Sequence, residues 1–123
     1  MLNEKKQEKD FSDESLKFTE ELLKVNVDCY TMWNYRREIL LQKFTASQDE
    51  EIQLLKKELT FIEQSIMKNA KSYWCWNQRE WVTSRLHSYH ICDWQRELEL
   101  CSKFLKYDAR NCIYFLNLFL VGI

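Results

Sequence analysis

The sequence predicts an all-α fold built from repeated antiparallel helix pairs, and three observations support this prediction. The 123 residues include one glycine and no proline, whereas sheets and tight hairpins need glycine at positions of positive φ. Apolar residues recur at the three- and four-residue spacings of an α-helix. A motif of Tyr, Trp, Asn and Arg occurs twice, 43 residues apart.

The first two expected helices lie between residues 12 and 44. Ser12 or Asp13 can cap the first helix, which is expected to end near Val25. Asp28 is a candidate cap for the second helix, which runs to about Phe44.

The third helix, expected over residues 50–68, has the most regular apolar spacing in the chain. Its apolar side chains recur every three or four residues: Ile52, Leu55, Leu59, Ile62 and Ile66. Both Ser47 and Asp49 can cap it. Ser72 opens a fourth helix, which is expected to reach about Leu86.

Residues 87–91 are expected to form a loop, after which Asp93 caps a fifth helix. One face of that helix is expected to be apolar and to carry Trp94, Leu98, Cys101, Phe104 and Leu105. Asn111 could begin a sixth helix.

The duplicated motif divides the chain into helix-pair repeats. Residues 30–36 match residues 73–79 at four positions, and Asn26 matches Asn69 upstream. Periods near 40 residues with two helices each are typical of helical solenoids, because stacked pairs bury faces that a single pair leaves exposed. We therefore expect a flexible segment at 1–11 and a repeat domain at 12–123, with repeats at about 12–44, 49–87 and 92–121.

The third repeat departs from the motif. Its frame predicts Trp and Arg at positions where the sequence has Phe115 and Leu118. Residues 112–123 are largely apolar and carry no polar capping repeat. We expect a degenerate or truncated repeat whose apolar end is exposed and poorly soluble, with a buried terminal helix as the alternative.

Composition excludes several functional classes. A net charge of -1 gives no basic field for nucleic acid or an anionic membrane. The sequence contains no apolar segment long enough to span a membrane and no signal segment at its start. The five cysteines form no Cys-x-x-Cys pair, which favours free thiols in a reducing compartment and a cytoplasmic location.

The repeated positions resemble a known family. Asn, then Trp seven residues later, then Arg three further on, is the spacing of protein prenyltransferase alpha-subunit repeats, and it occurs here twice: Asn26, Trp33, Arg36 and Asn69, Trp76, Arg79. Residues 32–40 and 96–105 resemble the N-terminal part of the Rab geranylgeranyltransferase alpha subunit in particular. The resemblance implies a right-handed alpha-alpha superhelix that wraps a beta subunit.

The resemblance also implies an activity and a site. The family's complex transfers a geranylgeranyl group from its diphosphate to C-terminal cysteines of Rab proteins, and Rab proteins with an escort protein are the implied partners. Zinc is expected on the beta subunit, with no cofactor in this chain. The family's diphosphate-binding Lys and Tyr correspond to Lys71 and Tyr73, and its His in the following repeat corresponds to Ile113.

Simpler roles compete with these assignments. Trp33 and Trp76 are most simply core anchors. Arg36 and Arg79 either pair with acidic residues of a neighbouring repeat or reach the beta subunit.

A metal site and catalysis by the isolated chain are not expected. The set His87, His90 and Cys92 lacks a fourth ligand, so we predict no metal site. Because no complete active site is present, the isolated chain is expected to be inactive. The alternatives are a non-catalytic interaction scaffold and a farnesyltransferase-type alpha subunit.

Overall fold

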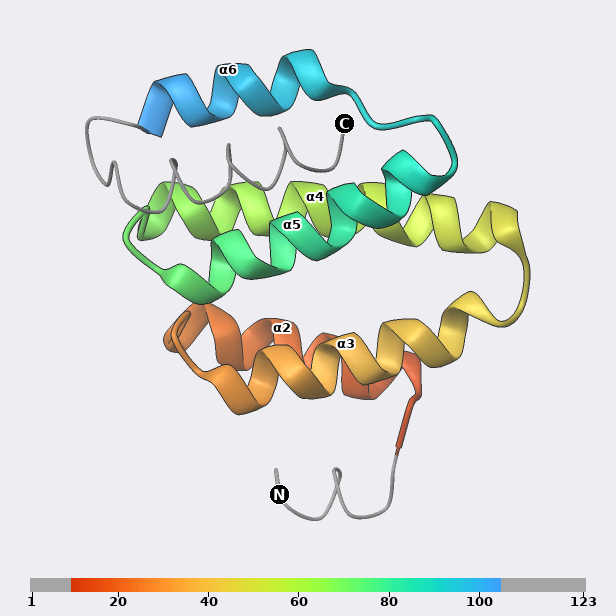
Figure 1. The fold of residues 1–123 in the computed structure, drawn as a ribbon. Helices are drawn as coiled ribbons and strands as arrows, with labels where there is room; N and C mark the ends of the chain where they lie inside the picture. The colour runs from red at the N-terminus through yellow and green to blue at the C-terminus, as the bar shows by residue number, and fades with distance from the viewer. Residues whose placement is uncertain (1–9, 105–123) are drawn as a thin grey trace. The chain divides into compact units, whose positions relative to one another are not determined.

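The structure is a computed structural model that describes residues 10–104. Every regular element in that range is an α-helix, and Figure 1 shows them in chain order: α2 (Asp13–Val25), α3 (Tyr30–Phe44), α4 (Gln48–Lys68), α5 (Tyr73–Ser88) and α6 (Trp94–Phe104). The predicted all-α repeat fold is thereby confirmed for this part of the chain. The expected sixth helix and the positions Leu105, Ile113, Phe115 and Leu118 lie outside the described residues.

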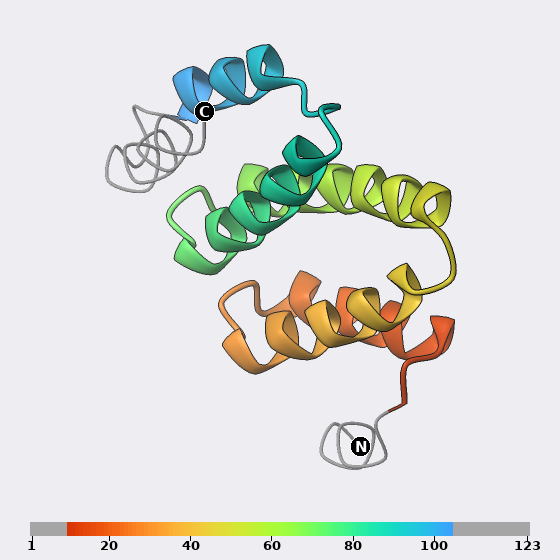
Figure 2. The ribbon, with the colours of Figure 1, turned by 45° about the vertical axis from the view of Figure 1, so that its right-hand side comes forward.

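The helices divide into two compact units, of which the first ends at Lys56 and the second begins at Lys57. In the first unit, α2 and α3 form an antiparallel pair whose helices stay side by side in Figures 1 and 2. Their apolar faces meet in a core that includes Leu23, Met32, Trp33, Ile39 and Leu40, none of them more than 3% exposed.

The start of α2 follows the prediction, whereas the start of α3 does not. Ser12 is the cap of α2, and its hydroxyl accepts a hydrogen bond from the Ser15 N–H at 3.2 Å. The residue before α3 is Cys29, so Asp28 is not the cap that we predicted. The Asp28 N–H instead donates to the Asn26 side chain at 3.1 Å, because Asn26 forms a turn that sets where α3 begins.

Helix α4 begins earlier than expected. Its first residue is Gln48, and the Ser47 hydroxyl accepts a hydrogen bond from the Glu50 N–H at 3.1 Å. Ser47, rather than Asp49, therefore caps the helix.

In the second unit, α4 from Lys57 onward lies beside α5 in both views. Its core is lined by fully buried side chains from three helices: Ile62, Ile66, Cys75, Trp76, Val82, Leu86 and Cys101. Helix α5 continues to Ser88, so His87 and Ser88 are helical rather than part of the predicted loop. The helix extends because its closing turn uses the carbonyls of His87 and Leu86, which accept the N–H groups of His90 at 2.8 Å and Ile91 at 3.2 Å.

Helix α6 begins as predicted but faces its neighbours differently. The Asp93 carboxylate accepts a hydrogen bond from the Arg96 N–H at 3.2 Å, which confirms Asp93 as the cap. Leu98, expected on the apolar face of this helix, is 38% exposed, whereas Glu97 is only 2% exposed. The helix turns Glu97 inward because this carboxylate binds a buried arginine of α5.

Candidate functional site

The two repeat tryptophans occupy equivalent positions in their units. Trp33 donates its indole N–H to the Val27 carbonyl at 2.8 Å, and Trp76 donates to the Ala70 carbonyl at 2.9 Å. Both acceptors lie six residues before the tryptophan, and both rings are buried. Each tryptophan therefore fills the core and also fastens the turn that precedes its own helix.

The two repeat asparagines shape these turns. The Asn26 side chain accepts the Asp28 N–H at 3.1 Å, and the Asn69 side chain accepts the Lys71 N–H at 3.2 Å. A short asparagine side chain can bond its own backbone two residues on, which mimics a backbone turn. The motif thus fixes the same turn twice and places equivalent residues at the start of α3 and α5.

The repeat arginines are buried and bind the helix that precedes them. Arg36 donates to the Leu16 carbonyl at 3.0 Å, and Arg79 donates to the Leu59 carbonyl at 3.4 Å. Arg79 also pairs with Glu97 through bonds of 2.5 and 2.8 Å, and both side chains are at most 3% exposed. For Arg79, the structure therefore favours pairing with an acidic residue of the next repeat.

Cys92 lies close to this ion pair. Burial, and after it the charge of Glu97, raises the pKa of its thiol to about 12, while Arg79 acts in the opposite direction. A thiol with so high a pKa stays protonated and unreactive near neutral pH. The charge pattern of the sequence contains no signal for this cluster, because Glu97 reads as one of several acidic residues on a solvated helix face.

Lys71 and Tyr73, the residues that the resemblance assigns to a diphosphate, lie at the start of α5. Both are exposed, and Tyr73 packs edge-on against the Trp74 ring with centroids 4.9 Å apart. The Ser72 side chain makes no capping hydrogen bond, and the first turn of α5 contains no acidic residue. The positive end of the α5 dipole and the Lys71 ammonium group therefore lie at the same turn.

The first repeat provides a contrast within the same molecule. Its equivalent positions are Asp28 and Tyr30, and Tyr30 is 50% exposed. The turn before α3 has the same hydrogen bonds as the turn before α5, but it carries a negative charge where the second repeat carries Lys71. Only the second of these turns combines a helix N-terminus with a cation suited to phosphate.

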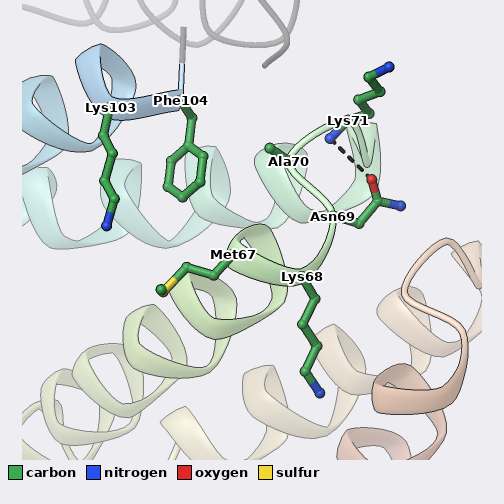
Figure 3. A pocket seen from close by; sticks show the side chains of 7 residues that line it. All are labelled: Met67, Lys68, Asn69, Ala70, Lys71, Lys103 and Phe104. Atoms are coloured by element: carbon green, nitrogen blue, oxygen red, sulfur yellow. Dashed lines mark hydrogen bonds between the residues drawn. The ribbon is translucent and has the colours of Figure 1, made fainter. Parts of the chain in front are cut away.

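A pocket of about 520 Å³ adjoins Lys71, and Figure 3 shows its lining residues: Met67, Lys68, Asn69, Ala70, Lys71, Lys103 and Phe104. The Lys68 and Lys71 side chains extend away from one another on either side of the turn. Tyr73 is not among the lining residues. Lys71 thus lines this pocket together with Lys68 and Lys103, whereas Tyr73, two residues later, does not line it.

The histidines and cysteine considered as metal ligands have other contacts. His87 accepts a hydrogen bond from the Trp94 indole at 3.2 Å. Among residues 10–104, the structure brings together no group of three or more His, Cys, Asp or Glu side chains that could hold a metal ion.

Comparison with known families assigns the repeat. The family described as "Protein prenyltransferase alpha subunit repeat" matches residues 12–43 and 55–86. The chain belongs to this family. The two matches correspond to the first two repeats expected from the duplicated motif, and in each the structure shows a buried tryptophan bonded to the preceding turn.

Several relatives of this chain are named geranylgeranyl transferase type-2 subunit alpha. This chain is 38% identical over 107 residues to the geranylgeranyl transferase type-2 subunit alpha of Dictyostelium discoideum, and the match covers 86% of this chain and 33% of the relative. The Candida albicans protein of that name is 40% identical over 105 residues, and the match covers 82% of this chain and 28% of the relative. The Mus musculus protein of that name is 46% identical over 101 residues, and the match covers 80% of this chain and 17% of the relative. The chain spans a third or less of the length of these relatives.

No helix in the described part of this prenyltransferase repeat chain is both long enough and apolar enough to cross a membrane.

Proposed function

We propose that the chain acts as alpha-subunit repeats of a type-2 geranylgeranyl transferase. In this role it scaffolds a zinc-bearing beta subunit in the cytoplasm and assists transfer of geranylgeranyl to the C-terminal cysteines of Rab proteins. Rab proteins and an escort protein are the proposed further partners. The observation that carries the proposal is the similarity of most of this chain to subunits of that name.

Lys71 and Tyr73 are the residues through which this chain would act on the substrate. In the transfer, a cysteine thiolate forms a carbon–sulfur bond to the isoprenoid as the bond from that carbon to the diphosphate oxygen breaks. Negative charge then accumulates on the departing diphosphate. The Lys71 ammonium and the Tyr73 hydroxyl, at the positive end of α5, can stabilise that charge. Zinc on the partner subunit would supply the acidification of the attacking thiol.

The contrast between the two repeats provides the test. In the complete alpha–beta complex, Lys71→Ala is expected to lower kcat/KM for the isoprenoid diphosphate by about 10- to 100-fold, because one cationic donor to the leaving group is lost. Lys71→Arg keeps the charge and is expected to retain part of the activity. Asp28→Ala, at the equivalent position of the first repeat, is the matched control and is expected to leave the rate unchanged.

Two results would contradict the proposed site. One is full activity of the Lys71→Ala complex, and the other is an equal loss in the Asp28→Ala complex. Running the same assay with farnesyl diphosphate separates a farnesyltransferase-type subunit from a geranylgeranyl transferase. A complex that forms but transfers neither group would indicate the non-catalytic scaffold.

A further inference from the structure

The pocket beside the α4–α5 turn has features that the proposed diphosphate site does not use. Its lining includes apolar side chains from the turn and from the end of α6, of which Ala70 is half-buried and Phe104 is 5% exposed. Met67, also in the lining, is 60% exposed. Two exposed lysines, Lys68 and Lys103, line the same pocket. The pocket thus combines an apolar interior with cations.

The two lysines come from different helices. Lys68 lies in the last turn of α4, and Lys103 lies in the last turn of α6. The Lys103 ammonium is 5.6 Å from the centroid of the Phe104 ring, so its charge lies close to the apolar interior. Among residues 10–104, no carboxylate forms an ion pair with either lysine, whereas Arg96 of α6 pairs with Glu63 of α4.

The helix dipole offers a simpler explanation for these lysines. A lysine in the last turn of a helix interacts favourably with the negative end of the dipole. This explains Lys68 and Lys103 one at a time, but it does not explain the exposed methionine that lies between them in Figure 3. Methionine is common at binding surfaces, because its flexible side chain adapts to different apolar partners. A volume of about 520 Å³ is also typical of ligand pockets, which range over about 300–1,000 Å³.

Acidic side chains lie on the other side of Lys103. There Lys103 lines a neighbouring hollow together with Glu63 and Glu99. Glu63 forms two bonds with Arg96, of 3.0 and 2.8 Å, and Glu99 accepts a bond from the Gln95 side chain at 3.5 Å. In the described lining of the larger pocket, by contrast, every charged side chain is a lysine.

The spread of the lysines decides which kind of anion fits the pocket. In Figure 3, Lys68 and Lys71 extend away from one another, and Phe104 and Ala70 lie between Lys71 and Lys103. A compact anion such as phosphate can therefore reach one ammonium group, whereas an extended segment with carboxylates on both sides of an apolar residue can reach two. A membrane surface fits less well, because it typically requires about four to eight clustered basic residues.

We propose that this pocket docks an acidic segment of a partner protein, with one apolar side chain of that segment against Phe104 and carboxylates at Lys68 and Lys103. The inference goes beyond the proposed function and does not depend on it, because Lys71 remains assigned to the diphosphate. Burial of the apolar anchor supplies most of the affinity, and the complementary charges select and orient the segment.

The test follows the methyl resonance of Met67 by nuclear magnetic resonance in the full 123-residue chain. The probe is the peptide acetyl-Glu-Asp-Leu-Asp-Glu-amide. One control peptide replaces its leucine with serine, and another replaces its four acidic residues with lysine. The buried methyl group of Met32, in the first unit, is the internal reference. We expect the acidic leucine peptide alone to shift Met67, with half-saturation on the order of 1 mM, and to leave Met32 unchanged.

Charge reversal at the two lysines tests the complementarity. The double variant Lys68→Glu/Lys103→Glu is expected to bind the acidic peptide about 10-fold more weakly or less, because it sets like charges against the carboxylates. The matched control is Lys24→Glu/Lys57→Glu, which makes the same change in net charge at two exposed lysines. Lys24 also lies in the last turn of its helix, as Lys68 does. This control is expected to bind as the parent chain does.

Several results would overturn the proposal. One is a Met67 resonance that does not move with the acidic peptide, or that moves equally in the Lys68→Glu/Lys103→Glu variant while Met32 keeps its parent position. Another is an equal shift with either control peptide or with inorganic pyrophosphate, which would indicate general apolar contact or a site for compact anions. The third is binding to phosphatidylserine-containing vesicles, lost in the same variant, without peptide binding; it would assign the surface to a membrane.

Discussion

At the scale of single residues, the tryptophans of the repeat combine two roles. Each ring is buried in its own unit, and each indole N–H closes the turn before its helix. Lys71, only five residues before Trp76, is exposed and adjoins a pocket at the helix start. Neighbouring positions in one motif thus place a buried core residue close to an exposed cation, for which substrate contact is proposed.

This separation can be measured by denaturant unfolding. Trp33→Ala and Trp76→Ala are each expected to lower the free energy of unfolding by about 3–5 kcal/mol, because a large buried ring is removed. Lys71→Ala is expected to change it by no more than about 0.5 kcal/mol, as for most exposed substitutions. Comparable losses in the lysine and tryptophan variants would show that the assignment of roles is wrong.

Cys92 gives a prediction in alkaline solution. The unfolded thiol loses its proton near its ordinary pKa of 9.0, whereas the folded thiol keeps its proton up to about 12. The group therefore stabilises the fold below pH 9, and this contribution is lost as pH rises from about 9 to 12. Over that range Cys92→Ala is expected to lose less stability than the parent chain. A parallel decline in both proteins would contradict the raised pKa.

At the scale of elements, charged pairs join the helices of the second unit in two environments. Arg79 of α5 and Glu97 of α6 are buried, and their bonds are 2.5 and 2.8 Å long. Arg96 of α6 and Glu63 of α4 also form two bonds, of 3.0 and 2.8 Å, but the Arg96 side chain is 59% exposed. Burial, rather than geometry, distinguishes the two pairs.

The two pairs are expected to differ in their contribution to stability. Glu97→Ala leaves the Arg79 charge buried without its carboxylate and is expected to cost about 3–5 kcal/mol. Glu63→Ala removes a solvent-screened pair and is expected to cost about 0–1 kcal/mol. Thermal or denaturant unfolding of both variants measures the difference, and equal losses would refute the contrast drawn from burial.

These elements also show where sequence patterns suffice. Apolar periodicity predicts α2, α4 and α6, whereas α3 and α5 lack a clear apolar face and are identified by the duplicated Trp motif. Both signals are local. The burial of Glu97 in place of Leu98 could not be predicted, since it depends on Arg79, which is 18 residues away. The same limit applies to Asp28, because the Asn26 side chain, rather than the nearest acidic residue, sets the start of α3.

The residues of the candidate site are identified by the family resemblance more than by the composition or spacing of the sequence. Lys71 is an ordinary exposed lysine by composition, and the resemblance alone singles it out. The structure adds that the second repeat repeats the hydrogen-bonded turn of the first and replaces Asp28 with Lys71. The absence of Tyr73 from the pocket lining depends on the tertiary structure and could not be predicted from residue spacing.

At the scale of the whole molecule, the family match over residues 12–43 and 55–86 assigns the chain to the protein prenyltransferase alpha-subunit repeats. Under the proposed function, the repeats would provide the scaffold and the Lys71 cation, and the remaining catalytic groups are expected on the partner. We therefore predict no prenyl transfer by the purified chain alone.

The most direct test of the account is to mix the purified chain with a type-2 geranylgeranyl transferase beta subunit and follow both by size-exclusion chromatography, with a farnesyltransferase beta subunit as the control. We predict a stable one-to-one complex with the type-2 subunit and none with the control. Before mixing, the chain is predicted to transfer no labelled geranylgeranyl group. Separate elution of the chain and the type-2 beta subunit, or transfer by the chain alone, would contradict the account.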